Sequence, residues 1–294
     1  MAILATLFSA KRLNTYVWLS LVSEIAIVVT GGFVRLTGSG LGCPTWPSCT
    51  AESLVNVPEM GIHGVIEFAN RLLTFALVIV AVLTLVTVIR FAEGREQRLR
   101  IPAIALLLGI PAQAVIGGIS VLTQLNPWVV GLHFVTSGVM ISIAALLLAR
   151  VKGWVSSVPA SVLSTLILVV GWIAVLIGVA VTGAGPHSGD AKTPRNGLDL
   201  ELWQHYHSYP GYLLLALVLI QLALLWKSGL TLDSRVFRIS ALLLATIVFQ
   251  AVVGVIQSRL GVPPLLVGLH MLGASVAIAL LTLQRLVTKA KEAA

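Results

Sequence analysis

Histidines lie at matching places in two related segments of this chain, and their type and spacing suit metal binding. The segment QAVIGGISVLTQLNPWVVGLH at 113–133 aligns without a gap with QAVVGVIQSRLGVPPLLVGLH at 250–270, so His133 matches His270. A second repeated motif, TGSG at 37–40 and TGAG at 182–185, places His63 near His207. Because imidazole is the commonest metal ligand among side chains, the repeat predicts a pair of candidate ligands in each half of the chain.

Heme iron is the metal that these paired histidines favour. Two imidazoles that face each other across a four-helix bundle are a ligand set for a heme held on both axial sides. Zinc needs a third or fourth ligand of the Cys, His or carboxylate type, and the apolar segments of the second half contain no such cluster. A single histidine at the end of a membrane helix can also be an interfacial polar residue, and this alternative stays open for each histidine taken alone.

Two further histidines have no fixed assignment from the sequence. His205 and His207 are two residues apart, so they point to different sides of a helix and cannot both face one iron. The repeat favours His207. His187 lies in the segment GPHSGD, which suits either a surface position or close backbone approach to a carboxylate such as a heme propionate.

An acid follows the first of these histidines. In HGVIEFANR, at 63–71, Glu67 lies one helical turn after His63, and Asn70 lies on the same face. A carboxylate within a membrane costs about 2.5–3.5 kcal/mol unless it is paired or solvated, and such residues are mostly functional. The alternative is a Glu67–Arg71 ion pair that seals the helix end. The second half has Gly211 near the matching position, so we expect chemistry in one half and electron transfer in the other.

Both cysteines of the chain lie in one loop, GCPTWPSC, on the side of the membrane that we expect to be the outer side. Outside the cytoplasm, two nearby cysteines usually form a disulfide. The pair Cys43 and Cys49 is therefore either a staple for this loop or a redox-active pair above the first site, and the spacing does not decide between the two.

The elements that position these residues are membrane-spanning helices. The chain has 294 residues, of which 57% are hydrophobic and 10% charged, and its mean hydropathy is +1.00. Eight apolar runs, long enough to cross a bilayer, are found at 15–36, 62–90, 101–122, 128–150, 159–183, 206–226, 236–258 and 264–287. We predict an all-α membrane protein of eight transmembrane helices, arranged as two duplicated four-helix bundles about a pseudo-twofold axis along the membrane normal. The predicted units are residues 1–152 and 153–294.

The positive charge of the chain reports its orientation. The net charge is +8, and lysines and arginines gather at both ends and in every second loop, while acids gather in the other loops. This distribution follows the positive-inside rule, so we expect both termini in the cytoplasm and the histidines near the outer face. The basic excess does not indicate a nucleic-acid partner.

Four segments in this order resemble the heme A synthase family, membrane enzymes that convert heme O to heme A for cytochrome oxidase: GGFVRLTGSGLGCPTWPSC, IEFANR, TGAGPHSGD and the paired VGLH segments. The resemblance covers nearly the whole chain. It implies oxidation of a porphyrin methyl group to a formyl group through hydroxylated intermediates, with water as the oxygen source. It also implies the bacterial plasma (inner) membrane as the location, with heme O synthase and cytochrome oxidase assembly factors as possible partners.

The resemblance also assigns roles to residues. It implies that His207 and His270 are the axial ligands of a heme b in the second half. It implies that the first half holds the substrate heme O, with His133 as an iron ligand and Glu67 as the catalytic carboxylate. The cysteine pair of the family matches Cys43 and Cys49.

The chain departs from the family pattern where many members have a histidine, three residues after the glutamate; here this residue is Asn70. His63, one turn before Glu67, is the candidate replacement. Whether His63 and His133 together hold the substrate iron, or His133 alone, is left open by the sequence. Some members also have a second cysteine pair between helices 5 and 6, and this chain does not.

Three other functions compete with this interpretation. A quinone-linked di-heme cytochrome b explains the four histidines but not Glu67. A transporter explains eight helices but predicts helices broken near the middle of the membrane, whereas the polar residues here cluster near the outer side. A heme-handling protein without catalysis is the third.

Overall fold

The computed structural model describes residues 8–91, 96–156 and 161–288, and this part of the chain folds into helices joined by turns and loops. Eight of the helices are long and apolar enough to cross a membrane, as the sequence predicts. The elements, in chain order, are α2 (Ala10–Leu36), the short 3-10 helix η1 (Pro58–Met60), α3 (Gly61–Phe91), α4 (Glu96–Leu122), α5 (Pro127–Val151), α6 (Val162–Ala184), α7 (Leu200–Lys227), α8 (Arg235–Arg259) and α9 (Pro264–Val287).

Polar caps and prolines determine where the helices begin. The side chain of Asp199 accepts a hydrogen bond from the backbone N–H of Leu202 at 2.8 Å, and Asn126 caps α5 in the same way through Trp128 at 3.0 Å. Pro127 and Pro264 occupy first helical positions, where a missing N–H costs nothing. The Asp199 cap explains why α7 begins six residues before the apolar run at 206–226.

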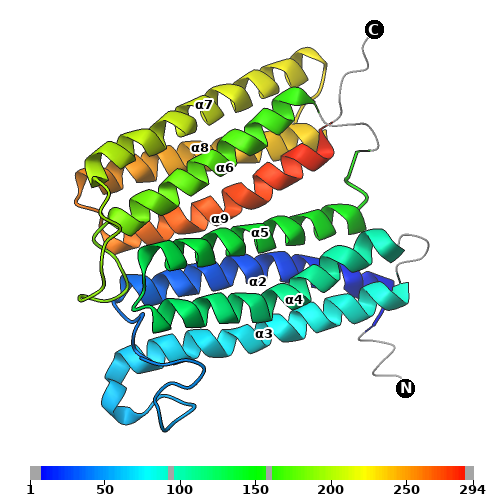
Figure 1. Ribbon diagram of the computed structural model, residues 1–294. Helices are drawn as coiled ribbons and strands as arrows, with labels where there is room; N and C mark the ends of the chain where they lie inside the picture. Colours follow the sequence, from blue (N-terminus) through cyan, green and yellow to red (C-terminus); the bar gives the residue numbers. More distant parts are fainter. Residues whose placement is uncertain (1–7, 92–95, 157–160, 289–294) are drawn as a thin grey trace.

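The helices contact one another in two rings. In the first half α2, α3, α4 and α5 contact in succession and α5 closes on α2; in the second half α6, α7, α8 and α9 do the same and α9 closes on α6. The two rings meet where α2 and α5 of the first ring contact α9 of the second (Figure 1). One buried core crosses this boundary and includes Val17 of α2, Leu147 of α5 and Ile278 of α9.

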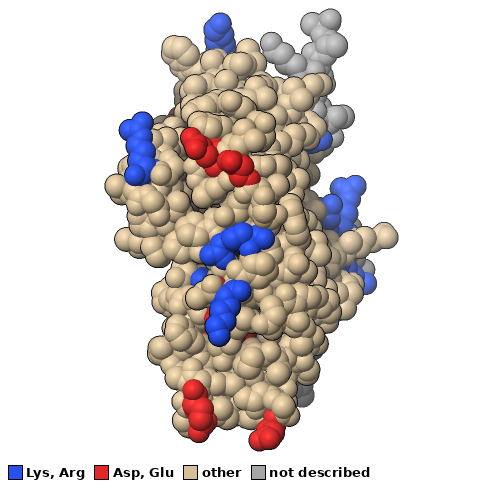
Figure 2. Space-filling view, turned by 60° about the vertical axis from the view of Figure 1, so that its left-hand side comes forward, with Lys and Arg blue, Asp and Glu red and all other residues tan. Residues whose placement is uncertain are grey.

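The long loops lie together at one end of the molecule. Residues 37–57 and 185–199 are at the left-hand end in Figure 1, while α2 begins and α9 ends at the opposite end. Large apolar side chains are exposed along the helices, among them Phe75, Leu108 and Val252. The view in Figure 2 shows few charged side chains among many uncharged ones. Such a surface suits the hydrocarbon core of a bilayer, where helices satisfy their own backbone groups.

Candidate functional site

In four helix pairs, α2–α3, α4–α5, α6–α7 and α8–α9, a glycine of the first helix faces one polar side chain of the second. A Cβ added to these glycines would lie within 4 Å of that side chain, and the nearest distances are 3.9, 3.3, 2.8 and 3.5 Å for Gly31–Asn70, Gly117–His133, Gly178–His207 and Gly254–His270. At Gly117 and Gly178 the missing side chain allows an approach closer than ordinary van der Waals contact, whereas at Gly31 and Gly254 an added Cβ would make an ordinary contact. Three of the four positions therefore hold histidine, and the one on α3 holds Asn70.

The same four residues carry orphaned polar atoms. Nδ1 of His133, His207 and His270 and Oδ1 of Asn70 are buried and have no hydrogen-bond partner among the described residues. Buried polar atoms in native proteins are nearly always paired, so each exception requires an explanation. Other buried side chains among the described residues, including Gln113, Gln250 and Gln284, also have an atom without a partner, so the feature that distinguishes these four is their related positions. Such positions suit sites that a bound group completes, and imidazoles are suitable donors for heme iron.

His207 of α7 and His270 of α9 face each other in the second half. Their ring centroids are 6.1 Å apart and the ring planes are inclined at 72°. A metal between two imidazoles, with metal–nitrogen bonds of about 2 Å, separates the two coordinating nitrogens by about 4 Å and the ring centroids by about 6 Å. Within the described residues no group of three or more His, Cys, Asp or Glu forms a cluster for a metal ion. The donor set therefore fits a heme held by two axial imidazoles.

The choice between the two neighbouring histidines of α7 follows from exposure. His205 is exposed, and its carbonyl accepts a hydrogen bond from Ser208, whereas His207 is partly buried and faces His270. His187 has a different environment: its Nε2 lies 2.7 Å from the carbonyl oxygen of Val262. His187 thus links the loop after α6 to the turn before α9.

Two glutamines, which the sequence analysis did not single out, support the histidine-bearing helices. Gln113 donates from Nε2 to the carbonyl oxygen of His133 at 3.3 Å, and Gln250 donates to that of His270 at 3.0 Å. A carbonyl in the first turns of a helix is already paired with the N–H four residues further on, so each amide adds a second donor to it. The two bonds tie α4 to α5 and α8 to α9. Both glutamines begin the repeated segments at 113 and 250, and this was the available signal.

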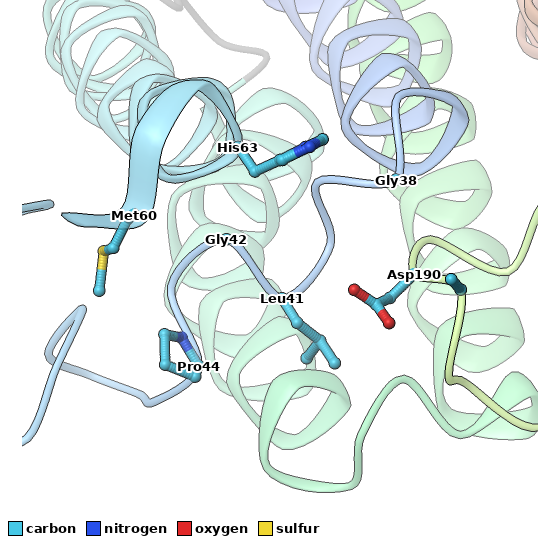
Figure 3. A pocket seen from close by; sticks show the side chains of 8 residues that line it. Gly38, Leu41, Gly42, Pro44, Met60, His63 and Asp190 are labelled. Atoms are coloured by element: carbon cyan, nitrogen blue, oxygen red, sulfur yellow. The ribbon is translucent and has the colours of Figure 1, made fainter. Parts of the chain in front are cut away.

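His63 lies apart from these four positions. Its side chain is exposed, and its Nδ1 lies 2.9 Å from the hydroxyl oxygen of Ser39. It lines a cavity of about 560 Å³ between the loop after α2, the start of α3 and Asp190 (Figure 3). The repeat register that placed His63 near His207 is not kept in the structure, where Asn70 has the matching position. The reason is that the loop between α2 and α3 is longer than the loop between α6 and α7, which shifts the register.

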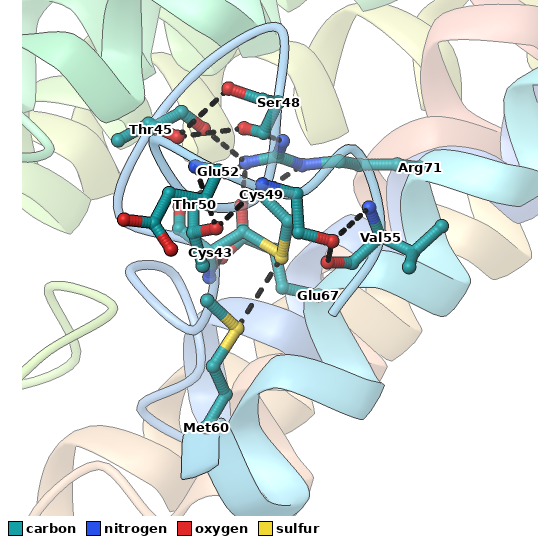
Figure 4. Close-up of a disulfide and its surroundings, with 11 residues drawn as sticks. Cys43, Thr45, Ser48, Cys49, Thr50, Glu52, Val55, Met60, Glu67 and Arg71 are labelled. Atoms are coloured by element: carbon teal, nitrogen blue, oxygen red, sulfur yellow. Dashed lines mark hydrogen bonds and ion pairs between the residues drawn. A yellow bond between two sulfur atoms is a disulfide. The ribbon is translucent and has the colours of Figure 1, made fainter. Parts of the chain in front are cut away.

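Glu67 is buried and anchors the cysteine loop. The residue is 6% exposed, and its Oε2 accepts a hydrogen bond from the backbone N–H of Cys43 at 2.5 Å. Oε1 accepts from Arg71 at 2.6 Å, so the ion pair that the sequence analysis gave as the alternative to a catalytic role is present. Arg71 also donates to the carbonyl oxygens of Cys43, Thr45 and Ser48 (Figure 4). The carboxylate and the guanidinium together hold the loop on α3.

The cysteine loop is closed by its own sulfur atoms. Cys43 and Cys49 form a disulfide with Cα atoms 4.5 Å apart, and both residues are fully buried. The sulfur of Met60 lies 3.4 Å from Sγ of Cys49 (Figure 4). The loop, the disulfide and Glu67 thus form one connected unit at the end of the molecule where the long loops lie.

The loops of the two halves are joined at this same end. Arg35, in the last turn of α2, donates to the carbonyl oxygen of Thr182 in α6 at 2.7 Å. The backbone N–H of Gly40 donates to the carbonyl oxygen of Gly189 at 2.9 Å. These bonds connect the ends of α2 and α6, close to the TGSG and TGAG motifs.

Together these features define a class: a polytopic helical membrane protein with facing imidazoles in one half and a buried, ion-paired carboxylate in the other. Residues 14–199 match the family model described as cytochrome oxidase assembly protein. The chain belongs to this family, that of the heme A synthases.

Individual relatives match over shorter segments. Heme A synthases of Listeria welshimeri and Listeria monocytogenes are 29% identical over 125 residues, which is 42% of this chain and 40% of each relative. A protein of Thermus thermophilus named protoheme IX farnesyltransferase is 37% identical over 62 residues, 21% of this chain and 10% of that protein. The aligned segments thus span less than half the length of these relatives.

Proposed function

We propose that this protein is a heme A synthase, which oxidises a methyl group of heme O to a formyl group through hydroxylated intermediates, with water as the oxygen source. Family membership and relatives named heme A synthase support this reaction. The observation that carries it is the chemical difference between the halves. His207 and His270 face each other in a half whose described residues include no buried carboxylate, whereas His133 shares its half with Glu67.

The proposed domains follow this difference. Residues 1–152 form the substrate bundle and residues 153–294 the heme b bundle, as two duplicated units related by a pseudo-twofold axis. The two rings of helix contacts, the four glycine-facing positions and the matched glutamine bonds support the duplication.

In the second bundle, His207 and His270 are the proposed axial ligands of heme b. When bound, heme b supplies a one-electron carrier whose potential depends on its axial ligands and its burial. The two side chains would hold the porphyrin between α7 and α9, where it would supply a path for electrons from the substrate bundle. His133 is the proposed ligand of the substrate iron in the first bundle.

Glu67 is the proposed catalytic carboxylate. The guanidinium of Arg71 stabilises its negative charge inside the protein, and a positioned carboxylate can accept a proton from water or orient it. The contact with the backbone N–H of Cys43 ties this carboxylate to the disulfide loop, which is proposed to cover the substrate bundle.

Pigment extraction tests the proposal. The chain is expressed with a source of heme O, and acid-acetone extracts are separated by chromatography and identified by mass. The expected products are heme A or its alcohol precursor. Only heme b would instead indicate the second candidate function, an electron-transfer cytochrome, which the His207–His270 geometry also supports. No heme at all would indicate a transporter.

The same extraction tests Glu67. Glu67→Gln keeps the size of the side chain and removes its charge, so heme A should fall by about a hundredfold or more, as for loss of a general base. Heme b should remain bound. The matched control is Glu24→Gln, since Glu24 is the other buried carboxylate among the described residues. Normal heme A from Glu67→Gln would refute the catalytic role.

Location and partners complete the proposal. The protein is proposed to lie in a bacterial plasma membrane, with both termini in the cytoplasm and the heme sites near the outer face. The start of α2 and the end of α9 lie on one side, opposite the long loops, which supports termini on the same side of the membrane, and the distribution of lysines and arginines favours the cytoplasmic side. A reporter that fluoresces only in the cytoplasm, fused after the C-terminus, should be fluorescent. A dark fusion would indicate that the C-terminus lies on the outer side. Heme O synthase is the proposed supplier of substrate, because heme O is the substrate of the proposed reaction.

A further inference from the structure

We infer that Asn70 occupies the fourth heme-facing position, so that a heme in the first bundle has His133 as its only imidazole ligand and His63 takes no part in binding the iron. This inference rests on the proposed function, because it requires an iron porphyrin in the first bundle. It goes further by assigning a different ligand set to each bundle.

The packing of the helices carries the first step. Gly31 of α2 faces Asn70 of α3 as Gly178 of α6 faces His207 of α7. Asn70 lies 21 residues before the last residue of α3, Phe91, and His207 lies 20 residues before the last residue of α7, Lys227. The two side chains therefore have the same partner and nearly the same depth along corresponding helices.

The orphaned atoms carry the second step. Oδ1 of Asn70 is buried without a hydrogen-bond partner, as is Nδ1 of each of the three histidines at the related positions. An unpaired buried amide oxygen costs about 1–3 kcal/mol unless something completes the site. Asn70 therefore shares with the histidines an unsatisfied polar group at a place where a ligand is expected.

His63 has none of these features. It lies about two turns nearer the start of α3 than Asn70, its side chain is exposed, and its Nδ1 already contacts Ser39. It lines the cavity beside the loop after α2, together with Met60 and Asp190 (Figure 3). At about 1.5 Å per residue, a separation of seven residues places His63 about 10 Å from Asn70 along the axis of α3.

The chemical consequence is an asymmetry between the two irons. Two imidazoles bind an iron on both sides, whereas a single imidazole leaves the other side to the polarity and hydrogen-bond donors of the pocket. The amide of Asn70 has two donor hydrogens and one acceptor oxygen, so it can bind a water or a polar group there. A heme held on one side only is also easier to exchange, which suits a substrate that must leave as product.

Spectroscopy of the purified protein tests the inference without relying on turnover. The double variant His207→Ala, His270→Ala removes the second heme site, and hemin is titrated into this background. We expect the heme bound in the first bundle to be high-spin by optical and electron paramagnetic resonance spectra. Adding Asn70→His should convert it to low-spin, whereas His63→Ala should leave the spectrum unchanged and His133→Ala should abolish binding.

Three results would overturn the inference. These are a low-spin first heme that becomes high-spin in His63→Ala, an unchanged spectrum in Asn70→His, and no hemin binding in the double variant. If Asn70→His fails to fold, the full-length chain with intact His207 and His270 still provides the test, because His63→Ala must leave its spectrum unchanged. Failure of the proposed function is distinguishable, since the expected spectra without any heme A would refute the reaction and keep the ligand assignment.

Discussion

At the residue scale, the function depends on which ring nitrogens the fold leaves without protein partners. His187 bonds to Val262 and His63 contacts Ser39, whereas His133, His207 and His270 each keep a buried Nδ1 that has no partner among the described residues. This separates the histidines that connect loops from those available to a bound group. The pair His207 and His270 is the most direct test of this division because the two rings face each other.

We predict that His207→Ala and His270→Ala each abolish the low-spin absorption of heme b in the purified protein. Removal of either ring takes away one axial ligand, and a single imidazole does not hold the iron in the low-spin state. The measurement is the reduced-minus-oxidised optical spectrum per mole of chain. His205→Ala is the matched control, because His205 is exposed on the same helix and should keep the full signal. A full signal in either of the first two variants would contradict the prediction.

The sequence predicted part of this residue pattern. The gapless repeat correctly related His133 to His270. Each matched segment contains a short loop between two helices, and the two loops have the same length. The TGSG and TGAG motifs, which placed His63 near His207, failed for α3, because the longer loop around Cys43 and Cys49 shifts the register between α2 and α3. The bond from Glu67 to the backbone of Cys43 could not be predicted either, since spacing does not show which way a loop folds back.

At the element scale, hydropathy predicted all eight spanning helices, because each helix needs an apolar stretch as long as the bilayer is thick. It could not predict that α7 begins at Leu200, where polar residues continue the helix beyond the apolar run from an Asp199 cap. Nor could it predict which glycines lie between helices. Gly178 and Gly254 show how much these contacts differ.

We predict that Gly178→Ala lowers the heme b content of the purified protein several-fold, while Gly254→Ala has little effect. A Cβ on Gly178 would lie 2.8 Å from Cε1 of His207, closer than van der Waals contact allows, so the ring or the helix must shift. A Cβ on Gly254 would lie 3.5 Å from Cε1 of His270, which is an ordinary contact. The low-spin absorption per chain measures both. Equal heme content in the two variants would show that these contacts do not position the imidazoles.

At the scale of the whole molecule, the two halves share one core. Helices α2, α5 and α9 meet at the boundary, and the buried cluster there contains residues of both halves. A helix that is apolar all round gives no indication from its sequence of which face meets a neighbour and which meets lipid. The pairing of the halves is therefore a result that only the structure provides. Its contribution to the stability of the protein can be tested at one glycine.

Gly138 of α5 faces two helices of the second half at this boundary, α6 and α9. A Cβ there would lie 2.9 Å from the ring of Trp172 in α6 and 3.1 Å from Cδ1 of Ile278 in α9. We predict that Gly138→Ala destabilises the protein by about 1 kcal/mol or more, because overpacking outweighs the gain in helix propensity. Gly211→Ala is the control, since nothing lies within 4 Å of its Cβ and the propensity gain of up to about 1 kcal/mol should remain. The temperature at which the low-spin heme absorption is lost should therefore fall in the first variant and rise or stay constant in the second. A rise in Gly138→Ala as large as that in Gly211→Ala would mean that the halves pack loosely at this boundary.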